Sequence, residues 1–361
     1  MKEGLPETAY VTWSRPKEVP QMGVYTGLDL SRKRLDWYAC RVDGTVVDAG
    51  AVTPDLDGLA WLVHRLGDGD VLAVIETMNG ARFVHDRLEL AGWDVRIADA
   101  QRARALAPLA CKTDRIDAQV LAELARRDLV PEVWLPDPRV RGERERARFR
   151  LHLVKHRTML KNRINQTLVA HGLGRPTRHL FGPKGRAVFE RLPLPEPWQG
   201  TLRASLVLID SLDEQIDELE RELRALGADH PYVPLLRTAP GIAWILAYTI
   251  ASEIGDINRF PTPRKLIGYT GLCPRVYQSG ETDRRGALAK NGPNYLRWAL
   301  IEAAHTAGRT SHYRPIIERM RDRHGRRRGS AIASVEIARR LSEAIWWMLT
   351  RNQPFAPAGA L

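Results

Sequence analysis

Four acidic residues in the first third of the chain have the types and spacing of a metal-dependent phosphoryl-transfer site. Asp29 and Glu76 each follow an apolar stretch, while Asp114 and Asp117 are three residues apart. That spacing puts two side chains on one face of a helix. Four carboxylates around one point repel each other unless cations neutralise them, and such hard oxygen ligands suit Mg²⁺ or Mn²⁺. Two such ions could activate an attacking oxygen and stabilise the leaving one.

Each acid also has a purely structural interpretation. Asp29 could start a turn, Glu76 could cap the helix that follows it, and Asp114 and Asp117 could stabilise a helix N-terminus. For one acid alone, the structural interpretation is the better one. The four together favour a metal site, because each falls where the expected fold places that site.

The elements that must position these acids follow the order of a ribonuclease-H-like fold. Three strands form an antiparallel meander with an Asp43-Gly44 turn, helices and strands then alternate, and a further helix starts near Thr113. In such a sheet, the strands that end near Asp29 and Glu76 are neighbours, so the two side chains converge. The expected strands are 24–30, 35–42, 46–52, 71–75 and 94–98, and the expected helices are 56–66 and 81–90.

The charge balance favours a polyanionic partner. The chain has 361 residues and a formal net charge of +12, and clustered cations gain affinity by releasing the counterions condensed on phosphates. Nucleic acid is therefore the expected partner. The alternative is compositional, because arginine outnumbers lysine here, as it does in many proteins from genomes rich in G and C.

Several classes of site and location are disfavoured. Cys40, Cys111 and Cys273 are far apart and form no Cys-x-x-Cys pair, which indicates neither a disulfide framework nor a zinc cage. No signal-peptide pattern and no run of ~18 apolar residues is found, so we expect no membrane partner. No phosphate loop for ATP is present. We expect a protein of bacterial type in a reducing cytoplasm, associated with the nucleoid.

The middle of the chain reads as two long helices. From Arg139 to Arg178 there are twelve Lys or Arg residues against two Glu, which indicates a nucleic-acid surface that includes Arg157, Lys161 and Arg163. The second helix has a heptad-like apolar seam from Leu202 to Leu226. Two partners for this seam are equally possible, a second protomer or the preceding helix within the chain. The candidate partner positions within the chain are Phe149, Leu153, Leu160 and Ile164.

The last region reads as helical apart from a central loop, in which Ser279 stands beside a glycine. Arg275, Arg284 and Arg285 could hold a phosphate there by bidentate hydrogen bonds. Without further information, a turn-forming Ser-Gly pair is the better interpretation. Gly241 lies in a segment that reads either as a helix-hairpin-helix turn binding a DNA phosphate or as an ordinary helix corner.

These motifs resemble, in order and over nearly the whole chain, the DEDD transposases of the IS110 insertion-sequence family, also described as bridge-RNA-guided recombinases. The N-terminal motifs are Gly27–Asp29, Ile75–Thr77 and Lys112–Ala118. The C-terminal signature runs from Gly271 to Arg297 and includes Gln278–Gly280 and Lys290–Gly292. One departure is visible at Ala287–Gly292, where a basic and a hydroxyl side chain of the usual pattern are missing.

The resemblance implies a RuvC-like domain that holds Mg²⁺ on the four acids, a coiled coil used in dimerisation, and a nucleophilic serine, which here is Ser279. It also implies a covalent phosphoserine, an assembly of two or four protomers with composite sites, and a structured guide RNA. The nucleic-acid contacts that we expect are Lys112, Arg157, Lys161, Arg163, Gly241, Arg275, Arg284, Arg285 and Lys290.

The predicted architecture is an α/β ribonuclease-H-like (RuvC-like) domain, a basic helical and coiled-coil middle, and a mainly α C-terminal transposase domain. The boundaries are a flexible tail 1–22, then 23–135, 136–230 and 231–352, and a tail 353–361. The predicted function is Mg²⁺-dependent DNA cleavage and strand exchange by an insertion-sequence transposase. Three rivals stay open: a Holliday-junction-type endonuclease that hydrolyses with water, a non-catalytic nucleic-acid-binding protein, and a self-associating scaffold.

Overall fold

The computed structural model describes residues 22–106, 114–174, 179–189, 191–279 and 282–356. Of residues 114, 115, 279 and 282–285 it describes the backbone alone. The chain divides into two compact units, residues 1–135 and 136–361. The predicted tail 1–22 lies almost entirely outside the described residues. None of the described helices is both long and apolar enough to cross a membrane.

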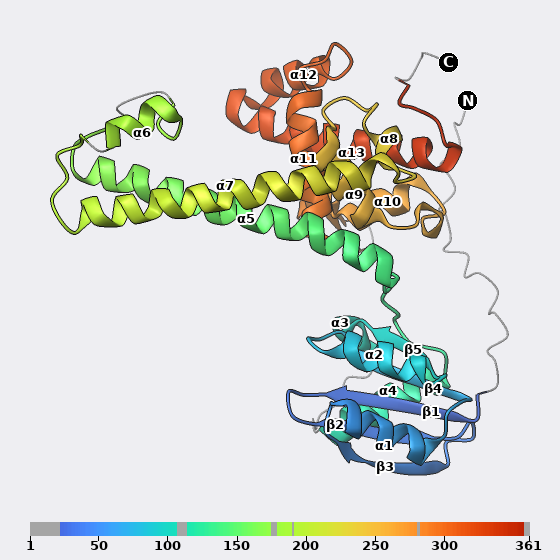
Figure 1. Ribbon diagram of the computed structural model, residues 1–361. Coiled ribbons are helices and arrows are strands. Elements are labelled where there is room, and N and C mark those ends of the chain that lie inside the picture. The colour runs from blue at the N-terminus through green and yellow to red at the C-terminus, as the bar shows by residue number, and fades with distance from the viewer. Residues whose placement is uncertain (1–21, 107–113, 175–178, 190, 280–281, 357–361) are drawn as a thin grey trace, which may run out of the picture. The chain divides into compact units, whose positions relative to one another are not determined.

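The first unit contains a mixed five-stranded sheet in the order β3-β2-β1-β4-β5 (Figure 1). The antiparallel meander β1–β2–β3 is continued by β4 and β5, which run parallel to β1. This order fits the predicted ribonuclease-H-like fold. Strand β2 ends two residues earlier than predicted, next to an irregularity in its pairing at Ala39 and Cys40. The bounds are β1 Val24–Leu30, β2 Leu35–Cys40, β3 Val46–Val52, β4 Val71–Glu76 and β5 Asp94–Ala98.

Helices cover both faces of this sheet. On one face, α1 (Leu56–Leu66) and α2 (Ala81–Leu90) pack on alternate strand residues such as Leu28 and Ile75. On the other face, α4 (Asp114–Arg126) packs on the intervening residues. The alternation follows from the two-residue repeat of a strand. The short helix α3 (Ala100–Leu106), which follows β5, was not predicted.

The second unit begins with two long helices, α5 (Pro138–Ala170) and α7 (Trp198–Ala228), which lie side by side with opposite chain directions (Figure 1). The short helix α6 (Pro183–Phe189) lies between them in sequence. Buried seam residues recur every seven positions on α7, at Leu202, Ile209, Ile216 and Leu223. The seam of α7 therefore packs against the preceding long helix, α5, which was one of the two predicted alternatives. Pairing with a second protomer stays a prediction.

One predicted seam position is wrong. Phe149 is 45% exposed, whereas Leu153 and Ile164 are buried. Phe149 is four residues before Leu153, but α5 also contacts α9, and its buried stripe near this point runs through Ala147 and Leu151. The side chain of Phe149 thus lies outside the stripe.

The remaining helices of the second unit surround one core, which also takes in Ala147 of α5 and Leu223 of α7. The predicted loop around Ser279 is wrong, since β6 and β7 form a two-stranded antiparallel sheet there. Val276 and Tyr277 on β6 are 60% and 69% exposed, so no buried face produced an alternating apolar pattern. The bounds are α8 Val233–Leu236, α9 Trp244–Ile254, a 3₁₀ turn Ile257–Arg259, α10 Pro263–Thr270, β6 Pro274–Ser279, β7 Thr282–Leu288, α11 Asn294–Ala307, α12 Arg314–His324 and α13 Arg326–Arg351.

Candidate active site

Asp29 and Glu76 lie on neighbouring strands at the same edge of the first unit's sheet. Strands β1 and β4 pair in parallel up to Leu28 and Ile75, the residues just before the two acids. Tyr25 on β1 and Val74 on β4 share a buried cluster with α4. Because side chains alternate along a strand, Asp29 and Glu76 lie on this same α4 face. Both side chains are partly buried.

Gly27 allows α4 to approach these two strands. A Cβ atom at Gly27 would overlap the carbonyl oxygen of Ala118 and would lie 2.5 Å from the backbone nitrogen of Ala122. Ala118 directly follows Asp117, and Gly27 is two residues before Asp29 on the same strand face. The close contact therefore brings the first turns of α4 against the part of β1 that ends at Asp29.

The other two predicted acids belong to α4. Asp114 is the first residue of the helix, and its side chain lies outside the described part of the structure. Asp117 is partly buried, one turn before Leu121, which packs on the sheet. Lys112, a predicted nucleic-acid contact, lies outside the described residues. Among the residues that are described, no group of three or more His, Cys, Asp or Glu meets the geometry of a metal site.

The donor set nevertheless has the chemistry of a hard-cation site. Asp29, Glu76 and Asp117 offer carboxylate oxygens from two strands and one helix that meet on one face of the sheet. Oxygen ligands of this kind bind Mg²⁺ or Mn²⁺ in preference to soft metals. The oxygen chemistry of these three side chains thus suits such an ion, although the described residues do not by themselves form a metal site.

A fifth carboxylate, which the sequence analysis missed, lies beside this site. Asp36 on β2 is the cross-strand partner of Asp29 and is 5% exposed. Like charges directly opposite each other destabilise an antiparallel pair. Arg34 neutralises Asp36 through two hydrogen bonds, Nε to Oδ2 at 2.7 Å and Nη2 to Oδ1 at 2.8 Å. The sequence did contain a sign of this residue, because Asp36 is an acidic residue between Leu35 and Trp37, two apolar residues of a predicted strand.

Ser279 belongs to the second unit and ends strand β6. Its backbone pairs with Thr282 of β7, and Tyr277 pairs with Arg284. The side chains of Ser279, Arg284 and Arg285 lie outside the described part, whereas that of Arg275 is exposed. The serine and two of the predicted arginines are thus carried by one hairpin, and Arg275 lies near its base. The acids and the serine belong to different units.

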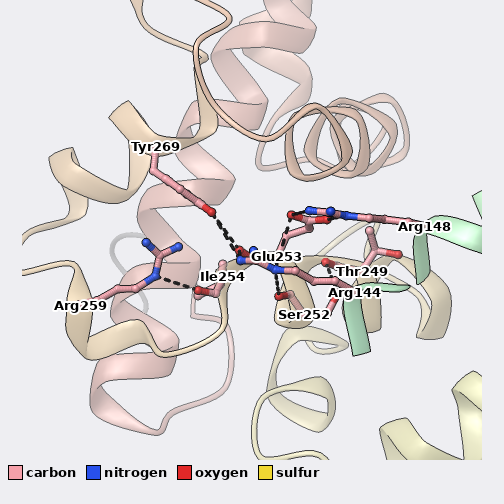
Figure 2. Close-up of polar contacts among 8 residues, drawn as sticks. All are labelled: Arg144, Arg148, Thr249, Ser252, Glu253, Ile254, Arg259 and Tyr269. Atoms are coloured by element: carbon pink, nitrogen blue, oxygen red, sulfur yellow. Dashed lines mark hydrogen bonds and ion pairs between the residues drawn. The ribbon is translucent and has the colours of Figure 1, made fainter. Parts of the chain in front are cut away.

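A buried polar network lies at the end of α9 (Figure 2). Glu253 is fully buried and accepts two hydrogen bonds from Arg148 of α5, at 2.7 and 2.9 Å. Arg144 donates to the carbonyl oxygens of Ser252 at 2.8 Å and Glu253 at 2.7 Å. Burial alone would lower the pKa of Arg148, but its hydrogen bonds to Glu253 and the charge of that carboxylate raise it. The network fixes α5 against the end of α9.

The same network reaches the segment that leads into the serine hairpin. The Tyr269 hydroxyl lies 3.5 Å from the Glu253 carbonyl oxygen, and Arg259 donates to the Ile254 carbonyl oxygen at 3.1 Å (Figure 2). The Arg259 guanidinium stacks 4.2 Å from the Tyr269 ring centre. Tyr269 is near the end of α10, five residues before β6 begins. This arrangement gives β6 a fixed starting point within the second unit.

Several basic side chains of the predicted nucleic-acid surface on α5 are already paired with acidic side chains of α7. Arg157 forms an ion pair with Asp213 of α7 at 2.5 Å, and Arg146 pairs with Glu222 at 2.7 Å. The premise that few acids balance α5 was wrong, because α7 supplies them. Burial and the charge of Arg157 lower the pKa of Lys161, whose amino group lies 5.3 Å from the Phe181 ring centre.

Two other predicted contacts have local structural features of their own. Gly241 has φ of 81°, and a Cβ atom there would lie 2.9 Å from the backbone nitrogen of Ala307. Close packing against α11 thus requires a glycine here, and the contact with a DNA phosphate stays a prediction. Lys290 is exposed and has φ of 55°, which a lysine seldom adopts. Arg163 is also exposed.

Known families match both units. Residues 26–172 match a DEDD-type IS110 model described as "Transposase". Residues 233–319 match the model described as "Transposase IS116/IS110/IS902 family". The first match contains Asp29, Glu76, Asp114 and Asp117, and the second contains Ser279.

Curated relatives agree with these matches. A "Probable family 20 transposase" of Pseudomonas aeruginosa is 28% identical over 298 residues, 79% of this chain and 86% of that protein. The transposase for insertion sequence element IS1328 of Yersinia enterocolitica is 27% identical over 79% of this chain and 85% of that protein. The pilin gene-inverting protein of Moraxella bovis is 25% identical over 68% of each chain. The chain therefore belongs to the IS110 family of DEDD transposases.

Proposed function

We propose that this protein cuts and rejoins DNA strands during transposition, with Asp29, Glu76, Asp114 and Asp117 holding Mg²⁺ or Mn²⁺ and Ser279 as nucleophile. The observation that carries the proposal is the contact of Gly27 with Ala118, because it brings Asp117 toward the sheet edge of Asp29 and Glu76. A bound divalent ion supplies positive charge for the attacking and leaving oxygens of the phosphodiester. Arg34 and Asp36 keep a neutral pair beside this charge.

In the proposed reaction, the Ser279 oxygen forms a bond to the scissile phosphorus and loses its proton. The phosphorus releases one DNA oxygen, which leaves as a strand hydroxyl after gaining a proton. A hydroxyl of the exchanging strand then loses its proton and attacks the phosphoserine, the bond between phosphorus and the serine oxygen breaks, and the serine oxygen regains a proton. One phosphodiester is exchanged for another, so no ATP is consumed. Arg275, Arg284 and Arg285 are the proposed ligands of the phosphate oxygens, because guanidinium groups bind phosphate through paired hydrogen bonds.

We also propose the partners that the family resemblance implies. These are donor and target DNA, a structured guide RNA that selects the sites, and a dimer or tetramer in which the acids and the serine of one site come from different protomers. The proposed place of action is the bacterial nucleoid in the cytoplasm. The formal net charge of +12 supports the nucleic-acid partners. The proposed additional nucleic-acid contacts are Lys112, Arg157, Lys161, Arg163, Gly241 and Lys290.

The nucleophile is tested by trapping the covalent intermediate. The wild-type protein, incubated with Mg²⁺ and end-labelled DNA of the element's termini, is expected to give a protein–DNA adduct in denaturing gels. Ser279→Ala is expected to give none. Asp29→Asn is expected to lower the yield of adduct at least about tenfold, because even the loss of a residue that only supports a metal ligand lowers metal affinity or activity about 10–100-fold. Both variants should still bind DNA.

The outcomes separate the rivals. Unchanged cleavage by Ser279→Ala would mean hydrolysis by water and would remove the serine from the mechanism. Cleavage unaffected by Asp29→Asn would remove the metal site. Purified protein that carries no discrete RNA and recombines without any would refute guidance and leave strand exchange intact.

A further inference from the structure

The α12–α13 corner carries a cluster of arginines that the proposed reaction does not use. Residues 309–328 contain eight arginines and two acids, Glu318 and Asp322, an excess equal to half the chain's formal net charge of +12. All eight are exposed. We name this the corner patch, and its members are Arg309, Arg314, Arg319, Arg321, Arg323, Arg326, Arg327 and Arg328.

Close packing of the two helices brings these charges together. Only Gly325 separates the end of α12 from the start of α13, and the two helices contact each other (Figure 1). A Cβ atom at Gly329 would overlap the Met320 carbonyl oxygen and lie 2.6 Å from the Arg321 Cα. Arg321 also donates to the Ser330 hydroxyl at 2.9 Å. The arginines of α12 thus lie beside those that begin α13.

Little within the second unit neutralises the corner patch. Among its described side chains, Arg314 alone forms an ion pair, with Glu318 at 2.9 Å, and both partners are more than half exposed. Exposed pairs of this kind contribute little. The arginines of α5 differ, since several of them are paired with acids of α7 or with Glu253. Concentrated like charge is unfavourable for a folded protein unless an anion neutralises it.

The patch also contains a recess that is large enough for a phosphate group and is lined by three of its arginines. A cavity of about 320 Å³ lies among Gly308, Arg309, Arg314, Ile317, Glu318 and Arg321. Arginine is suited to phosphate because its planar guanidinium donates paired hydrogen bonds to two oxygens. Arg309 and Arg321 have no ion-pair partner among the described side chains.

We propose that the corner patch binds the sugar-phosphate backbone of duplex DNA, independently of sequence. The choice of DNA rests on membership of a transposase family and not on the proposed roles of Ser279 or a guide RNA. The family match that contains the hairpin ends at residue 319, so Arg326, Arg327 and Arg328 lie beyond it. Backbone contacts position a protein on DNA without reading its sequence.

The test removes three charges from the start of α13. The variant Arg326→Gln/Arg327→Gln/Arg328→Gln is compared with the control Arg65→Gln/Arg82→Gln/Arg87→Gln, which loses the same charge from α1 and α2. Binding of random-sequence duplex DNA is measured by fluorescence anisotropy over a salt series with EDTA, so that no cleavage occurs. Loss of three phosphate contacts lowers the slope of log K against log salt by roughly 2.7, at about 0.9 per contact.

The control triple is expected to keep the wild-type slope. An Arg→Lys triple at 326–328 retains the charge and should keep most of the slope, and equal thermal midpoints would show that α13 is folded. A Gln triple with the wild-type slope and affinity overturns the proposal, as does an equal loss in both Gln triples. Lost binding to a structured RNA, with DNA binding unchanged, also overturns it and assigns the surface to RNA. Because no cleavage is measured, failure here leaves the proposed reaction untouched.

Discussion

Gly27 has no side chain where α4 touches β1, and the geometry of the acidic site depends on that contact. The variant Gly27→Ala is expected to push α4 off the strand, because the new methyl group would overlap the Ala118 carbonyl. Overpacking of a buried contact costs about 1–3 kcal/mol. We expect a loss near the upper end of this range, because the methyl group would meet backbone atoms of α4, which cannot move aside as a flexible side chain can. The free energy of unfolding from urea titration measures the loss, and Mg²⁺-dependent cleavage should fall with it.

Gly69 offers the matched control in the same unit. No atom lies within 4 Å of a Cβ built there, so Gly69→Ala should leave both stability and cleavage near wild type. If Gly27→Ala were as stable and as active as Gly69→Ala, the close approach of α4 would not position Asp117.

At the residue scale, the sequence could predict a role that depends on neighbouring residues, but not one that depends on a pairing partner elsewhere in the chain. Asp29 lies near the end of one recognisable apolar strand and Glu76 just past the end of another, so their placement at one sheet edge followed from strand order alone. Asp36 was missed because its relevance comes from its pairing with Asp29 across a turn. Arg157 looked unpaired for the same reason, since Asp213 is 56 residues away in sequence.

At the scale of the elements, the fully buried carboxylate of Glu253 on α9 holds α5 in place through its hydrogen bonds with Arg148. Removing one partner of a buried ion pair strands the other and costs about 3–5 kcal/mol. Glu253→Gln is expected to lower the free energy of unfolding by about 2–3 kcal/mol, below that range, because the Arg148 side chain is 37% exposed and water screens part of its unpaired charge. Urea unfolding followed by circular dichroism measures it.

The exposed pair of Arg146 and Glu222 provides the comparison on the same helix. Both side chains are 44% exposed, so Glu222→Gln should cost at most about 1 kcal/mol. Equal losses in the two variants would mean that Glu253 has no special role in fixing α5.

The sequence predicted helices and strands that have at least one buried face, and it missed strands that have none. Strands β1 and β4 read as short apolar runs and are buried almost throughout, because helices cover both faces of the sheet. The α7 seam carried a heptad pattern that matches its burial. The β6–β7 hairpin read as a loop, because Val276 and Tyr277 are exposed and no apolar face marks its strands. Register and pairing partners stayed beyond the sequence, because they depend on contacts between distant segments.

At the scale of the whole molecule, each hydrophobic cluster of the described residues lies within one of the two units. The clusters around β1 and β4 contain only residues of the first unit, and the large cluster around α9 and α13 contains only residues of the second. The proposed reaction needs the acids of one unit and the serine of the other. The proposed site therefore combines side chains from two units that fold around separate clusters.

Separate cores predict two unfolding transitions for the free protein in calorimetry. Gly27→Ala should lower the midpoint of one transition and leave the other unchanged, and Glu253→Gln should do the reverse, because each substitution acts within one core. A loss of 1 kcal/mol shifts a midpoint by about 2–8 °C for domains of these sizes, which calorimetry resolves. A single transition moved equally by both substitutions would show that the cores unfold as one, and the two units would then be mechanically coupled without any nucleic acid.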